Sequence, residues 1–208
     1  MSCVVLAAVA VLQGCVPLVV AGVGTSVVAT IDRRSYGAQL EDVEIQRRFG
    51  AQVSDALAAK TNVSATSYNR WVLLTGQAID DASRAQIEQI ARGIPNVREV
   101  INQITIGYPS SFATRANDAL ITSNIKALMV NRKDIAPNNV KIVTESNVVY
   151  LMGLVTESEA NAAVEVARTG SGVSRVVRVF EIISDDEAKR LSPPSTPPPQ
   201  GDKSSNPN

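Results

Sequence analysis

The sequence contains an internal repeat, and this repeat limits the fold more than any other feature. The stretch Asn62–Ala78, NVSATSYNRWVLLTGQA, matches Asn139–Val155, NVKIVTESNVVYLMGLV, at one constant spacing. In the second stretch apolar and polar residues alternate with a period of two, and then come a polar pair, an apolar run and a glycine. This pattern predicts two strands joined by a tight turn, with the second strand covered on both faces and ended by Gly76 or Gly153. We therefore expect two copies of one small domain.

The similarity extends to both sides of each hairpin. Helices are predicted after the glycines, over Asp80–Arg92 and Glu157–Arg168. The second opens with Thr156 and Glu159, a capping box in which a hydroxyl and a carboxylate satisfy free helix amides. A valine-rich strand follows each helix, NVREVINQITI in the first copy and GVSRVVRVFEII in the second.

An amphipathic helix is also predicted before each hairpin. Apolar residues at helical spacing mark the side expected to be buried. These residues are Ile45, Phe49 and Val53 in the first copy, and Ile121, Ile125 and Leu128 in the second. The order α-β-β-α-β, present twice, predicts an α+β fold in which each copy packs a small three-stranded mixed sheet on two helices.

The size of the copies predicts that they dock on one another. The chain has 208 residues, enough for two small domains and little more. A domain of roughly 65 residues buries only about 60% of the surface that its unfolded chain exposes, so it is marginal alone. Cys3 and Cys15 both precede the copies, so no disulfide can stabilise either one. We therefore expect a shared interface.

The composition argues against catalysis and against nucleic acid. Basic and acidic residues balance at 20 each, and histidine is absent, which removes the commonest general base and metal ligand. The acidic pair Asp80-Asp81 stands at a predicted helix start, where carboxylates cap amides. We predict no catalytic residue, no metal site and no cofactor, and hence a protein that is not an enzyme.

The N-terminal residues match the pattern of a bacterial lipoprotein signal. The apolar run Val4–Leu12 leads into Leu12-Gln13-Gly14-Cys15, a lipobox, although no Lys or Arg precedes the run. Residues 1–14 are then a signal peptide, Cys15 is the acylated first residue of the mature chain, and 15–40 form the acylated N-terminus and tether. The alternative is that Cys3–Ala29 forms a plain transmembrane anchor, which Pro17, Gly22 and Gly24 weaken.

Composition also divides the rest of the chain. The two copies span 41–106 and 117–184, and the Gly-, Pro- and Ser-containing segment 107–116 is predicted to link them. Residues 185–208 are predicted to form a proline-rich disordered tail, in which Asp185–Arg190 can extend a helix by a turn or two. The segment Ile31–Gly37, IDRRSYG, is expected to be a solvated turn.

The paired hairpins resemble a known family. NRWVLLTGQ and VYLMGLVTE, each followed by a helix and a valine-rich strand, look like the hairpins of BON domains. With its lipobox and the segment Ala116–Ala119, the chain is similar to dual-BON outer-membrane lipoproteins, from about Ser35 to Ile183. The resemblance implies a lipid-anchored protein of the outer membrane that faces the periplasm, binds anionic phospholipid such as phosphatidylglycerol, and supports membrane integrity.

In this family the first helix of the second domain is implicated in lipid contact. We expect Asn117 and Asp118 to cap this helix and Leu120 to begin it, at a position where the best-known members carry an interfacial tryptophan. Nearby cations would contribute ~1 kcal/mol each at an anionic surface. The predicted lipid-binding residues are Leu120, Ser123, Asn124, Lys126, Ala127, Arg132 and Lys133. The alternative is that the cations complement the helix dipole and that Leu120 packs on the neighbouring domain.

A second function is also compatible with the sequence. The protein could be an adaptor or chaperone that binds partners in outer-membrane protein assembly, through an exposed hairpin around Tyr68–Trp71 and through the proline-rich tail. Trp71 itself begins an apolar strand, which favours a place in the core.

Overall fold

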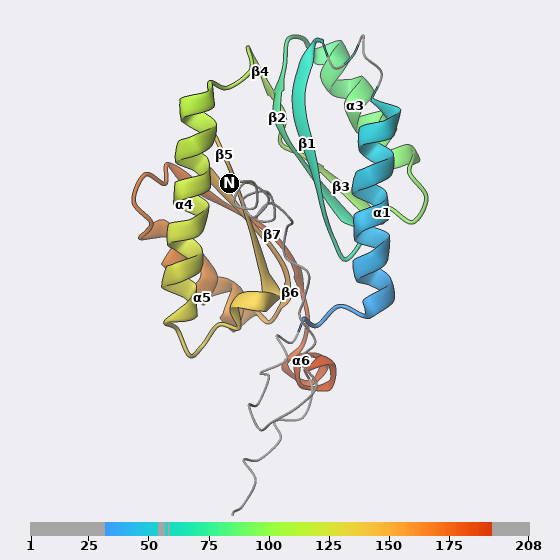
Figure 1. Ribbon diagram of the computed structural model, residues 1–208. Helices are drawn as coiled ribbons and strands as arrows, with labels where there is room; N and C mark the ends of the chain where they lie inside the picture. Colours follow the sequence, from blue (N-terminus) through green and yellow to red (C-terminus); the bar gives the residue numbers. More distant parts are fainter. Residues whose placement is uncertain (1–31, 54–56, 58, 193–208) are drawn as a thin grey trace, which may run out of the picture.

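Each half of the molecule is a small sheet covered by helices (Figure 1). The structure, a computed structural model, describes residues 32–53, 57 and 59–192. The predicted signal peptide, the lipidation of Cys15, most of the tether and the tail from 193 onward lie outside the described residues. The element order confirms the predicted α+β class and the α-β-β-α-β order of both copies.

The elements of the first copy are α1 (Tyr36–Gln52), β1 (Thr61–Tyr68), β2 (Trp71–Ala78), α3 (Asp81–Gly93), β3 (Glu99–Asn102) and β4 (Thr105–Ile106). Those of the second are α4 (Phe112–Val130), the short 3-10 helix η1 (Pro137–Asn139), β5 (Val140–Glu145), β6 (Val148–Val155), α5 (Glu157–Arg168) and β7 (Arg175–Ile182). In each copy the hairpin is antiparallel and the last strand joins its second strand in parallel. The capping box of Thr156 and Glu159 is present, and Asp80 caps α3.

The sheet of the first copy differs from the predicted three strands. Its last strand is divided into β3 and β4, which both pair with β2. At the break, the side chain of Asn102 accepts a hydrogen bond from the amide of Ile104 at 3.0 Å. A side chain thus replaces a ladder partner for one residue, after which pairing resumes. In the second copy β7 pairs with β6 from Arg175 to Ile182 without a break.

We predicted that the two matching glycines end their strands, and this prediction is wrong. Gly76 lies within β2 and Gly153 within β6, and both strands run two residues further. A Cβ atom would lie 2.0 Å from the carbonyl oxygen of Asn62 at Gly76, and 2.3 Å from that of Asn139 at Gly153. The repeat therefore preserves glycine because another part of the backbone passes too close for any side chain.

The two copies pack sheet against sheet, with α1 and α3 on one outer side and α4 and α5 on the other (Figure 1). Alternate residues of β2 and β6 point to opposite faces: Leu73 and Met152 point between the sheets, whereas Val72 and Leu151 point toward the helices. The shared interface that we expected is thus an apolar core between the sheets. Its buried residues are Tyr68, Leu73, Tyr150, Met152, Leu154 and Val179.

Polar contacts surround this core. Asn69 donates to Glu181 at 2.7 Å, and Arg98 pairs with the same carboxylate at 3.1 Å. At the opposite end of the interface, where the open end of the first hairpin meets the turn of the second, Gln77 donates to Glu145 at 2.7 Å. Each contact joins the first copy to the second, so the relative position of the two sheets is fixed at both ends.

A buried aspartate on the first helix of each copy holds the hairpin turn. The turn residues have positive φ: 50° at Asn69, 66° at Arg70, 50° at Ser146 and 64° at Asn147. Asp42 of α1 accepts the amides of Asn69 and Arg70 at 2.8 and 2.7 Å. Asp118 of α4 accepts those of Ser146 and Asn147, both at 2.8 Å. The carboxylates satisfy two turn amides that the hairpin itself cannot.

The position of Asp118 corrects two predictions about this helix. We expected Asn117 and Asp118 to cap it, but α4 begins at Phe112 and Ser111 is its N-cap. Five residues of the predicted linker 107–116 are therefore helical. The buried side of α4 is Asp118, Ile121, Ile125 and Met129, and Leu128 is 37% exposed. Val53 in the first copy is likewise only half-buried.

We expected the segment before α1 to be a solvated turn, and this expectation is wrong. Arg33 is buried and donates to both carboxylate oxygens of Glu159, at 2.6 and 2.8 Å, and to the carbonyl of Leu154 at 3.0 Å. The next residue, Arg34, pairs with Asp42 at 2.6 Å. Arg33 thus binds the second copy, and Arg34 binds the first. We refer to Asp32–Arg34 as the strap.

The chain after β7 begins with the helical turns that the sequence allowed for Asp185–Arg190. Asp185–Leu191 form the short helix α6, which Ser184 caps. Ala188 of this helix is buried, and Ser192 lies within hydrogen-bond distance of Arg33. The first residues of the predicted tail therefore contact the strap.

Replacement of Asp118 by alanine should destabilise the protein by about 2–3 kcal/mol, because it leaves two turn amides without an acceptor. Asp42→Ala should cost more, since Asp42 also accepts from Ser67 and pairs with Arg34. Urea unfolding of the full chain measures both. The control is Asp134→Ala, which removes an exposed pair with Arg132 and should cost under about 1 kcal/mol. Equal losses for Asp118→Ala and Asp134→Ala would contradict this assignment.

Replacement of Arg33 by alanine should cost about 3 kcal/mol, because Glu159 loses its partner in a largely buried pair. Burial opposes ionisation of Glu159, but hydrogen bonds from Arg33 and Thr156 prevail and lower its pKa below the usual 4.5. A lowered pKa stabilises the fold above the unfolded value, and this stabilisation is lost as the pH falls through the folded value. The gap between wild type and Arg33→Ala in urea unfolding should therefore narrow below about pH 4.5. A gap independent of pH would refute the ion pair.

Candidate functional site

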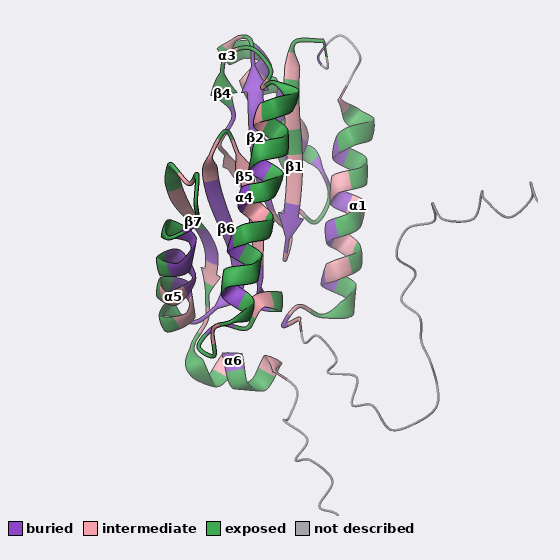
Figure 2. Ribbon diagram, turned by 60° about the vertical axis from the view of Figure 1, so that its left-hand side comes forward, coloured by how far each residue is buried: buried purple, intermediate pink, exposed green. Residues whose placement is uncertain are grey.

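The outer face of α4 is exposed and is not required by either core (Figure 2). Leu120, 70% exposed, lies on the side of the helix opposite Ile121, Ile125 and Met129. Of the predicted lipid-binding residues, Ser123, Asn124 and Ala127 surround it and are exposed too. The alternative that Leu120 packs on the neighbouring domain is therefore wrong. The structure brings these four residues together as one surface, which we call the α4 face.

The α4 face extends further than the sequence predicted. Phe112 and Val130, at the two ends of the helix, are 80% and 64% exposed, and both lie on the edge of this face. Between them, Ala113 and Ala116 are small and exposed. We missed these residues because we began the helix at Leu120. Ser111 directly before Phe112 was the available signal, since serine is a preferred N-cap.

The three predicted cations do not join the α4 face. Arg132 pairs with Asp134 at 2.6 Å and lies 3.8 Å from Glu165, so its charge is already compensated. Arg132 and Lys133 both follow the end of α4, and Lys133 is exposed. Lys126 lies on a flank of the helix, about 120° around the axis from Leu120 at 100° per residue. Of the three, only Lys133 is an exposed cation near the end of this face.

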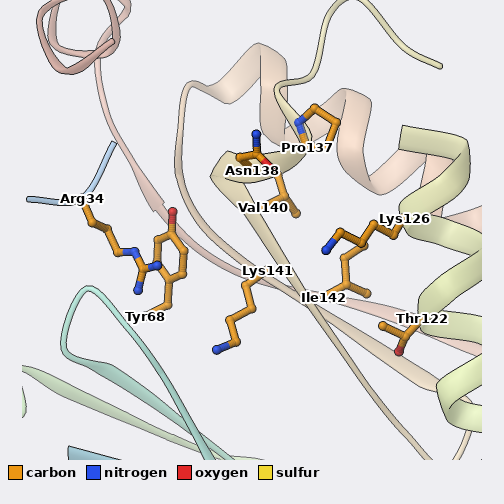
Figure 3. A pocket seen from close by; sticks show the side chains of 9 residues that line it. All are labelled: Arg34, Tyr68, Thr122, Lys126, Pro137, Asn138, Val140, Lys141 and Ile142. Carbon is orange, nitrogen blue, oxygen red and sulfur yellow. The ribbon is translucent and has the colours of Figure 1, made fainter. Parts of the chain in front are cut away.

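Lys126 instead lines a cavity of about 340 Å³ between the two domains (Figure 3). The cavity follows β5, an edge strand, with α4 on one side and Arg34 and Tyr68 on the other. Lys141 projects from β5 toward Tyr68, and Lys126 reaches from α4 toward the same strand. The complete lining is Arg34, Tyr68, Thr122, Lys126, Pro137, Asn138, Val140, Lys141 and Ile142.

Most side chains of this cavity are held by neighbours. The guanidinium of Arg34 stacks on the ring of Tyr68, 4.1 Å from its centroid. The Tyr68 hydroxyl lies 3.4 Å from the carbonyl of Asn139, and burial raises its pKa. Thr122 and Thr144 share a hydrogen bond at 2.7 Å. The pKa of Lys141 is lowered, chiefly because the side chain is partly buried and also because the positive charge of Arg34 lies nearby. The sequence offered no signal for this cavity, because its walls come from segments far apart in the chain.

The hairpin around Tyr68–Trp71 is not an exposed contact surface. Tyr68 is 4% exposed, and Trp71 packs against the core between the sheets. Of the two surfaces on which we based the adaptor hypothesis, the hairpin is therefore largely covered by the second domain. The other, the proline-rich tail from residue 193 onward, lies outside the described residues.

Among the described residues, no group of three or more His, Cys, Asp or Glu side chains is placed to hold a metal ion. No helix in the same part of the chain is long and apolar enough to cross a membrane.

Comparison with known proteins identifies both copies. The BON domain family model matches residues 41–108 and 117–184. The chain is 34% identical over 174 residues to outer membrane lipoprotein DolP of Haemophilus influenzae, covering 83% of this chain and 90% of that protein. It is 32% identical over 155 residues to a 21 kDa hemolysin of Actinobacillus pleuropneumoniae, covering 74% and 80%.

A more distant relative is osmotically-inducible protein Y of Escherichia coli, which is 26% identical over 144 residues, covering 67% of this chain and 72% of that protein. The matched residues include every strand of both sheets. The chain therefore belongs to the BON domain family and carries two copies of the domain.

Proposed function

We propose that this chain is a non-enzymatic lipoprotein of the outer membrane, anchored through acylated Cys15 and facing the periplasm. Its second BON domain binds anionic phospholipid through the α4 face and thereby supports membrane integrity. The name of the Haemophilus relative, outer membrane lipoprotein DolP, supports the compartment and the anchor. The lipobox ending at Cys15 supports them independently.

The observation that carries the lipid contact is the exposure of Leu120. A leucine that is 70% exposed at the middle of a helix face contributes nothing to the core of its own domain. Its immediate neighbours on that face are small or short, so the side chain stands above them. Burial of a leucine in an apolar phase is worth about 1.5–3 kcal/mol. Leu120 can gain this energy by entering the acyl region of a bilayer.

The affinity of the α4 face alone is expected to be weak. Leu120, together with Phe112 and Val130 at the two ends of the face, supplies only a limited apolar area. Lys133 adds ~1 kcal/mol at an anionic surface. A lipid anchor on the same chain changes this balance. It makes the second contact intramolecular, so a weak interaction is populated at the high local concentration of lipid.

One observation favours a second function, a protein-binding adaptor. Tyr36, Leu40 and Val43 occupy one side of α1 at helical spacing and are 75%, 53% and 64% exposed. The helix α1 belongs to the first domain and lies on the opposite side of the molecule from α4 (Figure 1). In the adaptor function this stripe, in place of the covered hairpin, would bind partners of outer-membrane protein assembly.

The α4 face is tested by NMR on the full chain in dodecyl maltoside micelles doped with phosphatidylglycerol or with phosphatidylcholine. The anchor inserts in both, so differences report the headgroup and the folded domains. Phosphatidylglycerol should shift the amides of residues 112–133 more than phosphatidylcholine does. Leu120→Asp should weaken this response roughly tenfold or more, since it removes the leucine that would enter the lipid phase and adds a negative charge that the anionic lipid repels.

The matched control is Leu40→Asp, an exposed leucine on the outer helix of the other domain. It should leave the phosphatidylglycerol response unchanged. If Leu40→Asp removes the response and Leu120→Asp does not, the contact belongs to α1 and the assignment to α4 is wrong. Both variants should keep the unfolding midpoint of the wild type, because neither side chain is in a core.

A further inference from the structure

We propose that the end of the tether, residues 26–31, pairs as an added strand with the free edge of β5, along the cavity between the two domains. These residues directly precede Asp32, the first residue that the structure describes. The added strand would complete the second sheet with a segment of the same chain. It goes beyond the lipid contact of the α4 face and does not depend on it, because no lipid takes part.

The outer edge of β5 is open. β5 pairs with β6 on one side and is the end strand of its sheet. The hairpin closes with a two-residue turn, so Glu145 and Val148 beside that turn exchange both hydrogen bonds. Two-residue steps back along β5 then place the amides and carbonyls of Ile142 and Thr144 on the side away from β6. Within the described part of the chain no backbone group bonds to them. Such an edge can accept an extended segment.

The cavity leaves room beside this edge. Its volume is about 340 Å³, and it borders β5 at Val140–Ile142, with α4 on one side and Tyr68 on the other (Figure 3). An added strand lies roughly 4.8 Å from its neighbour, so its backbone would run along the cavity. Its side chains would alternate between the side of Thr122 on α4 and the side of Tyr68.

The tether enters the fold at the start of β5. Asp32 lies close enough to Lys141 of β5 for its charge to act on that side chain. Arg33 donates to the carbonyl of Leu154, one residue beyond the partner of Val140 in the hairpin. The residues before Asp32 can therefore run back along β5 toward its turn. This direction predicts an antiparallel pairing, with residues 26–30 opposite β5.

The composition of the tether favours a strand only in this part. Residues 26–31, SVVATI, contain two valines, a threonine and an isoleucine, and they contain no charge, glycine or proline. Pro17, Gly22 and Gly24, which disfavour strands, all lie further from the fold. The part of the tether that is suited to pair with β5 is thus the part next to the strap.

Pairing with β5 would shorten the tether. The 17 residues 15–31 can span roughly 60 Å when fully extended. With residues 26–31 on β5, the 11 residues 15–25 span roughly 40 Å at most. The edge of β5 would then limit how far the domains lie from the membrane. This consequence rests on the proposed acylation of Cys15, whereas the pairing itself does not.

Amide hydrogen exchange of the full chain in dodecyl maltoside, measured by NMR, tests the pairing. In the wild type the amides of Ile142 and Thr144 should exchange slowly, because the tether accepts their hydrogen bonds. The double variant Val27→Pro/Val28→Pro removes two backbone donors and breaks the added strand. Both amides should then exchange roughly tenfold faster or more.

The matched control is Val19→Pro/Val20→Pro, the same change in a second Val-Val pair of the tether. It should leave the exchange of both edge amides as in the wild type. Lys141 and Val143 serve as internal standards, because their amides face β6 in every variant. Their exchange should stay constant. An acceleration there as large as at the edge would mean that the hairpin itself opens, which contradicts a local effect of the tether.

Slow exchange of Ile142 and Thr144 that is lost only in Val27→Pro/Val28→Pro supports the added strand. Rapid exchange in the wild type overturns it, as does equal protection in the two double variants, which would mean that something else covers the edge. Protection that falls on dilution also overturns it and identifies a second copy of the chain on β5. Leu120→Asp, which tests the α4 face, should leave this exchange unchanged, so the two proposals can fail separately.

Discussion

The burial of two sheets against each other is the interaction on which the rest of this structure depends. Each sheet is apolar on both faces, and its own helices cover only one of them. Leu73 and Met152 would face water if the domains separated, whereas Val72 and Leu151 would remain buried. Because exposure of such surface is costly, neither domain is complete without the other. The repeat is thus a single folding unit made of two similar halves.

This docking also decides which surfaces are left for function. Tyr68 of the first hairpin is buried in the interface between the sheets, whereas α1 and α4, on opposite sides of the molecule, each keep an exposed outer face. The cavity exists only because the two sheets meet beside the edge strand β5, with Arg34 and Tyr68 on one side and Lys126 on the other. The α4 face is thus a surface that this packing leaves exposed, and the cavity is a gap that the packing leaves between the domains.

Much of the fold could be predicted from local patterns. The hairpins, α5 with its capping box, and the two-sided burial of β2 and β6 all follow from periodicity and from Thr156 and Glu159. Several errors share one cause, a residue whose partner lies far away in the sequence, whereas the start of α4 at Ser111 was a local signal that we missed. We predicted that Asp118 caps a helix because its actual partners, the amides of Ser146 and Asn147, belong to a turn far along the chain. We predicted that Arg33 and Arg34 are solvated because the sequence did not indicate that they pair with Glu159 and Asp42. For the α4 face, the spacing of the sequence predicted the exposed group of Leu120, Ser123, Asn124 and Ala127, but it missed Phe112 and Val130 at the ends of the face. The cavity could be found only from the assembled tertiary structure.

The strap gives the molecule a mechanical property. Tension applied through the chain before Asp32 arrives first at two neighbouring guanidinium groups, and each is held by a carboxylate of a different domain. The load is thereby divided between the two halves at the seam where they join, and neither helix α1 nor its hairpin bears it alone. A pull from a tethered end would strain two ion pairs before it could peel one sheet from the other.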